Sequence, residues 1–381
     1  MCMVSTNCLS SLSECLNALP LHMTQELPQR GDHVTIVCAA ADEQEALRFV
    51  DDLGAKPVAL CLFDADESHN KNGPYGIGRV GFDNLNMFPE ATILLYSPEY
   101  FSVPVKKSNG FFAAKTLLRH VGHFTLAPAL KHDTWHTRRF PDMYSEHGRQ
   151  LEDIFTKLKD DSSRIAFAQA VKMLLTGNPG YCRPAPYAQY FHPDVCVRGG
   201  DTVVDGGTHS LAECKLFAEA TGKDGQVLCF EPEPSLYQRL AKEAADLPSS
   251  TYHIRPFHCG LGASSFSCYI VSEDAGSWMT NKPRAGASKV MMRDLDSLLI
   301  ENGIKRVDVI KLDVEGCECD VLRGAAECIR RDKPRLMISG YHRKDDLITI
   351  PALLHSIEPA YTLCFACHEC FVGEFLYYAQ V

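Results

Sequence analysis

The sequence predicts an α/β protein, because short apolar runs alternate with amphipathic helical patterns in both halves of the chain. Its 381 residues exceed what one hydrophobic core usually serves. Hydrophobic residues make up 45% and charged residues 23%, a composition typical of folded globular proteins. We therefore expect two domains, a smaller amino-terminal α/β domain of Rossmann type and a carboxyl-terminal α/β domain.

Changes of pattern divide the chain into four segments, at residues 1–31, 32–147, 148–199 and 200–381. The first is a leader. The second is a small α/β accessory domain, in which the strand HVTIVCAA, the helix EQEALRFVDDLG and the strand KPVALCLFDAD make a β-α-β start, followed by a strand at 91–96. The third is a helical linker that stops at Gly177. The fourth repeats strand, turn and helix.

The charge balance and the absence of targeting patterns argue against several classes of protein. The net charge of -10 disfavours a nonspecific nucleic-acid binder, because phosphate affinity comes from clustered Lys and Arg. No apolar run approaches the ~20 residues that span a bilayer, and no basic segment precedes an apolar stretch at the amino terminus. We expect a cytoplasmic protein with neither nucleic-acid nor membrane partners, whose 17 cysteines are mostly reduced thiols.

A cluster of cysteines near the carboxyl terminus has spacing that resembles a zinc site, formed by Cys364, Cys367, His368 and Cys370. These residues lie in the strand-like run YTLCFACHECF. In a strand, residues separated by an odd number of steps point to opposite faces, so Cys364 and Cys367 would diverge. We expect no metal site here.

The accessory domain contains a GxGxxG string, Gly76-Ile-Gly78-Arg-Val-Gly81, which raises the alternative of a nucleotide-binding oxidoreductase. A phosphate-binding loop needs glycines where the first strand turns into its helix. That turn reads Cys38-Ala-Ala-Ala-Asp-Glu, without glycine. The position of the string therefore disfavours this alternative.

The fourth segment begins with a pattern that suits a nucleoside cofactor. The strand at 202–205 ends in Asp205 and leads into a helix through Gly206, Gly207, Thr208, His209 and Ser210. Glycines let a cofactor lie against bare backbone. The next strand ends in Glu231, suited to accept hydrogen bonds from ribose hydroxyls, although an acid there could instead cap the following helix. A later loop at 259–262 includes Cys259 and Gly260, placed to border an adenine.

Two further strands of this segment end in polar residues. The strand at 307–313 ends in Asp313 and continues into Glu315 and Glu318, and the strand beginning at residue 335 leads to His342. Carboxyl ends of strands in α/β sheets are where ligands bind, so we expect the acids and His342 to converge on one crevice. Alternatively, the acids stabilise the positive end of the helix dipole, and His342 is a capped or stacked histidine without a role in chemistry. We expect Glu318 to support its helix.

These residues together resemble the FkbM-type methyltransferases. The matching strings are VVDGG, VLCFEPEP, HCGLG, IKLDVEGCE with VLRGA, and KPRLMISGYH closing on FLYYA. The resemblance implies a class I methyltransferase fold at 200–381, with a mostly parallel sheet ending in an antiparallel hairpin of 362–366 and 375–379. It also implies S-adenosyl-L-methionine as cofactor, with Asp205 and Gly207 at its methionine end, Glu231 at the ribose and 259–262 at the adenine.

The resemblance further implies transfer of a methyl group to a hydroxyl of a small molecule, sugar or natural product. A base must then remove the hydroxyl proton. His342 is the first candidate because histidine titrates near neutral pH. Asp313 and Glu315 are alternatives that would orient the acceptor or a metal, and the sequence leaves open whether a metal assists. The sequence leaves open which small-molecule or glycan acceptor is used and whether the chain forms a homo-oligomer.

One position departs from the family pattern. Members usually continue the glycine pair with another glycine and an acid, whereas this chain has Leu211 and Ala212. Leu211 would narrow the space beside the methionine tail, and Ala212 removes a polar contact for which Glu213 could compensate. This departure favours a second alternative, a catalytically degenerate methyltransferase-fold protein with an assembly or binding role.

Overall fold

The computed structural model describes residues 10–19, 21, 23–24, 26–63, 77–96, 113–114, 117, 124–127, 139–208, 211–248, 252–273, 276–280, 282–283, 286–369 and 374–381. The chain divides into two compact units. The first unit comprises Met1–Thr156, Arg164–Pro186 and Cys367–Gly373, and the second unit comprises Lys157–Ser163, Tyr187–Ala366 and Glu374–Val381.

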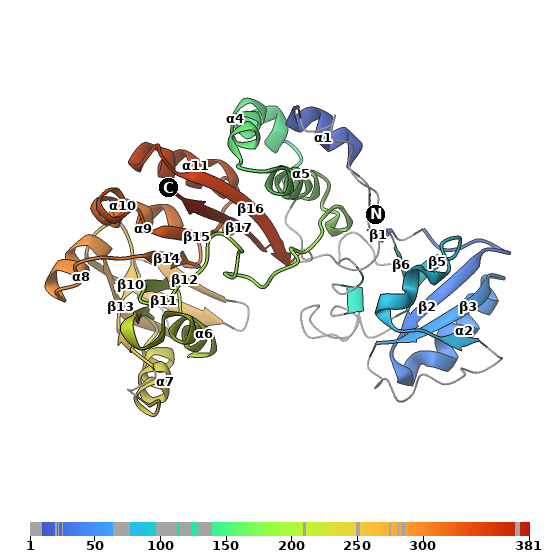
Figure 1. Ribbon diagram of the computed structural model, residues 1–381, viewed down its shortest axis with the longest axis horizontal. Coiled ribbons are helices and arrows are strands. Elements are labelled where there is room, and N and C mark those ends of the chain that lie inside the picture. Colours follow the sequence, from blue (N-terminus) through green and yellow to red (C-terminus); the bar gives the residue numbers. More distant parts are fainter. Residues whose placement is uncertain are drawn as a thin grey trace. The chain divides into compact units, whose positions relative to one another are not determined.

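The first unit contains a six-stranded sheet in the order β1-β6-β5-β2-β3-β4, with β2, β3 and β5 drawn as blue to cyan arrows in Figure 1. Every described pairing in it is parallel. Its strands are β1 (Met23–Thr24), β2 (His33–Cys38), β3 (Lys56–Leu62), β4 (Gly78–Arg79), β5 (Thr92–Tyr96) and β6 (Phe124–Ala127). The parallel sheet confirms the predicted small Rossmann-type domain.

Helix α2 (Glu43–Asp52) connects β2 to β3 and buries Ala46, Leu47 and Val50 against the sheet core. The short helix η2 (Ala40–Asp42) fills the turn after β2, where the sequence lacks glycine, and η5 (Phe82–Met87) precedes β5. Gly76 of the GxGxxG string lies outside the described residues, and Gly78 begins β4 at the far edge of the sheet from β1.

Among the described residues, helix α1 (Leu12–Ala18) precedes β1 in the sequence. Helices α4 (Met143–Lys157), α5 (Asp161–Thr176) and η9 (Pro179–Tyr181) follow β6. Ser11 caps α1 by accepting from the backbone N–H of Glu14. The first N–H groups of α1, at Leu12 and Ser13, donate to the Glu152 carboxylate of α4 at 2.8 and 2.9 Å. Because helix N-termini leave such groups unpaired, this contact ties the leader helix to α4.

The second unit is organised around a seven-stranded sheet in the order β16-β17-β15-β14-β7-β8-β9 (Figure 1). The five strands from β15 to β9 are parallel, and β17 runs antiparallel to β15. The strands are β7 (Thr202–Gly206), β8 (Gln226–Phe230), β9 (Ile254–Phe257), β14 (Val309–Leu312), β15 (Arg335–Ser339), β16 (Thr362–Glu369) and β17 (Glu374–Gln380). A mostly parallel sheet with two final strands side by side agrees with the prediction.

Helices connect the parallel strands: α6 (Leu211–Thr221), η10 (Gly222–Asp224), α7 (Pro234–Ala245), α8 (Leu295–Glu301), α9 (Glu318–Gly324), α10 (Ala326–Asp332) and α11 (Asp346–Ile357). The helix starts follow local chemistry. Glu233 caps α7 by accepting from Leu236 N, with Pro234 at the first helical position. Asp294 caps α8 in the same way through Ser297 N. Among the described residues, no helix has both the length and the apolar character needed to cross a membrane.

A second, four-stranded sheet in this unit was not expected from the sequence. Its order is β10-β13-β11-β12, formed by β10 (Gly260–Leu261), β11 (Phe266–Glu273), β12 (Gly276–Thr280) and β13 (Ala287–Arg293). The expectation that 259–262 is a loop is therefore corrected, because Gly260 and Leu261 pair with Met292 and Arg293. A Cβ on Gly260 would lie 2.5 Å from the Met292 sulfur, so a side chain there would require the flexible Met292 side chain to move.

Candidate functional site

The ends of strands β7 and β14 bring together a buried ion pair. Lys311 pairs in register with Asp205, and its Nζ lies 3.0 Å from Asp205 Oδ1. The two side chains are 1% and 0% exposed. The ammonium also donates to the Gly207 carbonyl at 3.2 Å and lies 3.5 Å from Glu213 Oε1. Since an isolated buried charge is costly, the ion pair offsets the cost of burying these two side chains.

The glycine turn after β7 is shaped by close backbone packing. Gly207 has φ of 85°, and a Cβ at this position would lie 1.8 Å from the Asp313 carbonyl oxygen. No residue with a side chain fits there. Thr208 follows, with its N–H donating to Phe230 O at 3.3 Å and its hydroxyl donating to Asp205 O at 3.0 Å. The turn thus joins the ends of β7, β8 and β14, while His209 and Ser210 lie outside the described residues.

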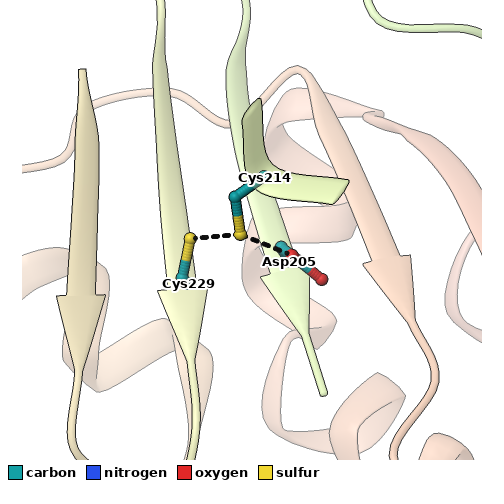
Figure 2. Close-up of side chains that lie close together, drawn as sticks. All are labelled: Asp205, Cys214 and Cys229. Carbon is teal, nitrogen blue, oxygen red and sulfur yellow. Dashed lines mark hydrogen bonds between the residues drawn. The ribbon is translucent and has the colours of Figure 1, made fainter. Parts of the chain in front are cut away.

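Two thiols lie beside Asp205, as Figure 2 shows. Cys214 Sγ donates to Asp205 Oδ2 at 3.2 Å and lies 3.0 Å from Cys229 Sγ. The hydrogen bond with Cys229, burial and the Asp205 charge raise the pKa of Cys214 well above its ordinary value, so the thiol stays protonated. These three side chains have the spacing of metal ligands. A cation here would face the Lys311 ammonium, so we assign them a structural role.

The first turn of α6 shows what replaces the family's glycine and acid. Leu211 is 7% exposed and packs into the core, whereas Ala212 is exposed. Glu213 turns toward Lys311 instead. Burial and the neighbouring Asp205 and Asp313 raise the pKa of Glu213 to about 7, although Lys311 acts in the opposite direction. An acid is therefore present beside the Lys311 and Asp205 pair, one residue later than in the family pattern.

The end of β8 places a buried carboxylate at the predicted ribose position. Glu231 is 6% exposed, and its Oε1 accepts from the backbone N–H of Glu233 at 2.8 Å. Burial raises the pKa of Glu231 to about 7 despite this hydrogen bond. The adjacent Cys259 and Gly260 are also buried. A buried carboxyl group at the end of a strand can accept hydrogen bonds from a hydroxyl-bearing ligand. The cofactor role of Glu231 stays a prediction.

Asp313, Glu315 and His342, predicted to converge, lie together beyond the ends of β14 and β15. His342 Nε2 is 3.4 Å from Asp313 Oδ1 and 3.6 Å from Glu315 Oε2. On the other side of the ring, His342 Nδ1 is 2.8 Å from Glu318 Oε1. The imidazole is 7% exposed and its ring centroid lies 4.2 Å from that of Tyr341. Convergence is thus observed, while the catalytic roles of these residues stay predictions.

The carboxylates around His342 set its protonation. Burial of the ring lowers the pKa of His342, but the hydrogen bond with Glu318 and the charges of Glu318, Asp313 and Glu315 outweigh burial and raise it above the ordinary 6.5. Glu318 also accepts from Val314 N at 2.9 Å and from Gly316 N at 3.4 Å, both in the turn that precedes its helix, so its expected support of the helix stays a prediction. It therefore orients the imidazole as well as the turn.

Asp313 is held by two hydroxyl donors. Tyr190 OH donates to Asp313 Oδ2 at 2.8 Å, and Tyr341 OH donates to Oδ1 at 3.1 Å. Burial raises the pKa of Asp313, but Lys311, His342 and the Tyr190 hydrogen bond act against it and hold the pKa below the ordinary value. Asp313 is therefore ionised at neutral pH.

Ligand atoms of Asp313, Glu318 and His342 lie within 4.8 Å of one another, a spacing compatible with a cation. The hydrogen bond of 2.8 Å between His342 Nδ1 and Glu318 Oε1 occupies a nitrogen and an oxygen that such a cation would use. The observed geometry is that of a hydrogen-bonded carboxylate and histidine pair. It does not require a metal.

Three residues of this site were not predicted to act in it: Lys311, Tyr190 and Tyr341. A signal for Lys311 exists in the sequence, because a lysine inside the apolar strand VIKL must be paired when buried. Tyr341 directly precedes His342. Tyr190 comes from the segment between Tyr181 and the sheet, where neither spacing nor periodicity points to this site.

The order of the seven-stranded sheet, with β17 antiparallel at β15 and a glycine turn after β7, defines a class I methyltransferase fold. Residues 205–356 match the family described as Methyltransferase FkbM domain. Within this range the chain is therefore similar to FkbM methyltransferase domains.

Two known proteins illustrate the similarity. One is the crystal structure of a methyltransferase FkbM from Methylobacillus flagellatus KT, which superposes with a TM-score of 0.54 at 20% sequence identity. The match covers 92% of this chain and 91% of the chain in that structure, and it supports the fold. The hexuronic acid methyltransferase AglP of Haloferax volcanii is 28% identical over 105 residues. That match spans 27% of this chain and 43% of the relative.

Proposed function

We propose that the protein is an S-adenosyl-L-methionine-dependent O-methyltransferase that acts on a hydroxyl of a sugar or other small molecule. One observation carries the proposal: the glycine turn at Gly207 packs directly against Asp313, which lies beside His342 and Glu315. A cofactor on that turn and an acceptor at that group of side chains would be neighbours. The name of the Haloferax volcanii relative supports a glycan acceptor.

The residues present fit the cofactor. A side chain at residue 207 would clash with the Asp313 backbone, so glycine leaves the turn bare. Glu231 offers a buried carboxyl group to ribose hydroxyls. At the methionine end, Asp205 is buried against Lys311, whereas the Glu213 side chain is 28% exposed and can offer its carboxyl group to an α-ammonium group. When bound, the cofactor supplies an activated methyl group on a sulfonium.

The chain's own residues then hold the acceptor and manage one proton. Glu318 fixes His342 through Nδ1, which leaves Nε2 as the atom that receives the hydroxyl proton. Asp313 and Glu315 flank Nε2 and accept hydrogen bonds from acceptor hydroxyls. Because His342 must be neutral to receive the proton, its raised pKa places the active form on the alkaline side of 6.5.

The test is release of S-adenosylhomocysteine from the purified protein with a panel of neutral glycosides, hexuronic acids and aglycone alcohols. Transfer to a hydroxyl, located by mass spectrometry of the product, is the expected result. Transfer only to carboxylates would replace the hydroxyl acceptor with an acid. Absence of both turnover and cofactor binding would favour the degenerate assembly protein suggested by Leu211 and Ala212.

A further inference from the structure

Tyr190 has a backbone conformation that is unusual for its residue type. Its φ is 66°, in the left-handed region that residues with side chains rarely adopt. Among the described residues, the other non-glycine positions with positive φ are Glu315 and Lys333. Lys333 ends helix α10, where this conformation is common. Tyr190 and Glu315 both reach the Asp313 and His342 pair, and strained residues cluster at functional sites.

Several contacts hold Tyr190 in place. Its backbone N–H donates to the Tyr378 hydroxyl of β17 at 3.3 Å. Its ring meets that of Phe217 edge-on, with centroids 6.4 Å apart, and the residue is 6% exposed. These contacts compensate for the backbone strain, so the side chain is presented to the site in one position.

The side chain touches both parts of the site. Lys311 Nζ lies 5.1 Å from the ring centroid, within the range of a cation–π contact. The hydroxyl donates to Asp313 Oδ2 at 2.8 Å. Tyr190 therefore contacts the ammonium that is paired with Asp205 and the carboxylate that lies beside His342.

We propose that Tyr190 is a positioning residue for methyl transfer, whose hydroxyl fixes the orientation of Asp313 toward His342 and whose ring holds the Lys311 ammonium. With Oδ2 engaged by Tyr190, Asp313 presents Oδ1 to Tyr341 and His342. Without that hydroxyl, Oδ2 loses this donor, and the contact of Tyr341 with Oδ1 holds the carboxylate less firmly. The reaction in this proposal rests on the proposed function, whereas the coupling between Tyr190 and His342 does not.

The test compares Tyr190→Phe, which keeps the ring and removes the hydroxyl, with Tyr187→Phe. Tyr187 lies in the same segment, and its ring packs on His192 and Tyr378, whereas the hydroxyls that donate to Asp313 are those of Tyr190 and Tyr341. Tyr190→Phe should lower kcat about tenfold to hundredfold, the effect of a lost hydrogen bond to a charged group, with unchanged affinity for S-adenosylhomocysteine. Tyr187→Phe should leave both unchanged. A Tyr190→Phe variant with wild-type kcat would overturn the proposal.

A second measurement needs no acceptor. In protein labelled with ¹⁵N-histidine, the His342 resonances are assigned by their loss in His342→Gln and titrated by NMR. Removing a donor from Asp313 leaves more negative charge for the imidazolium, so Tyr190→Phe should raise the pKa of His342 by about half a unit. A titration within about 0.1 unit of wild type would overturn the proposal. If wild type methylates nothing, the proposed function fails while this titration still decides the role of Tyr190.

Discussion

Replacing Lys311 with methionine tests the buried ion pair at the centre of the site. The variant keeps a flexible side chain of similar length but leaves Asp205, which is fully buried, without its cation. Breaking a buried pair in this way costs about 3–5 kcal/mol. Cys214 still donates to Asp205, and Glu213 is 28% exposed and partly solvated, so we expect the lower end, about 3 kcal/mol.

A loss of this size should lower the Tm of the second unit by about 6–12 °C, at roughly 2–4 °C per kcal/mol for a domain of about 150–250 residues. Differential scanning calorimetry measures it. Lys289→Met, at an exposed position of β13, is the matched control and should stay within about 0.5 kcal/mol of wild type. The double variant Asp205→Asn, Lys311→Met removes both charges and should recover at least half of the loss. A Tm of Lys311→Met equal to that of Lys289→Met would mean that the buried ion pair does not stabilise the fold.

Two further predictions concern pH. Burial raises the pKa of Glu231 to about 7 in the folded protein, above its ordinary 4.5, so the folded state binds the extra proton and stability falls as pH rises from about 4.5 to 7. Glu231→Gln should therefore be more stable than wild type at pH 8, by about 1–3 kcal/mol. Equal urea midpoints of the two proteins at that pH would contradict the raised pKa of Glu231. The pH profile of kcat/KM should rise with a midpoint above 6.5, because the active His342 is neutral and the surrounding carboxylates raise its pKa. Glu318→Gln removes the negative charge that is hydrogen-bonded to the imidazole, so it should move the midpoint to lower pH. An unmoved midpoint would assign the titration to another group.

Much of the fold could be predicted because each parallel strand is a short apolar run followed by a turn and a helix. The strands ending at Asp205, Glu231 and Asp313 were expected where the structure has them, and so were the final two strands. The sheet formed by β10 to β13 was not, because β11, β12 and β13 follow one another, among the described residues, without the helices that separate the parallel strands. Its pairing also turns the expected loop at 259–262 into strand β10.

The site could be predicted in part for a similar reason. Carboxyl ends of parallel strands meet at one edge, which brought Asp313 and His342 together as expected. The pairing of Lys311 with Asp205 depends on the register between β14 and β7, which lie about a hundred residues apart in the sequence. Tyr190 reaches Asp313 from a segment outside the sheet, through a backbone conformation that no local pattern indicates. Sequence periodicity carries no information about either contact.

The most direct test of the account is calorimetric titration of the purified protein with S-adenosyl-L-methionine and S-adenosylhomocysteine, alongside the Glu231→Ala variant. We expect micromolar affinity for wild type, about -8 kcal/mol, and loss of binding in the variant, because Glu231 is the buried carboxyl group at the end of β8. A folded wild-type protein that binds neither compound, or a variant that binds both as tightly as wild type, would contradict it.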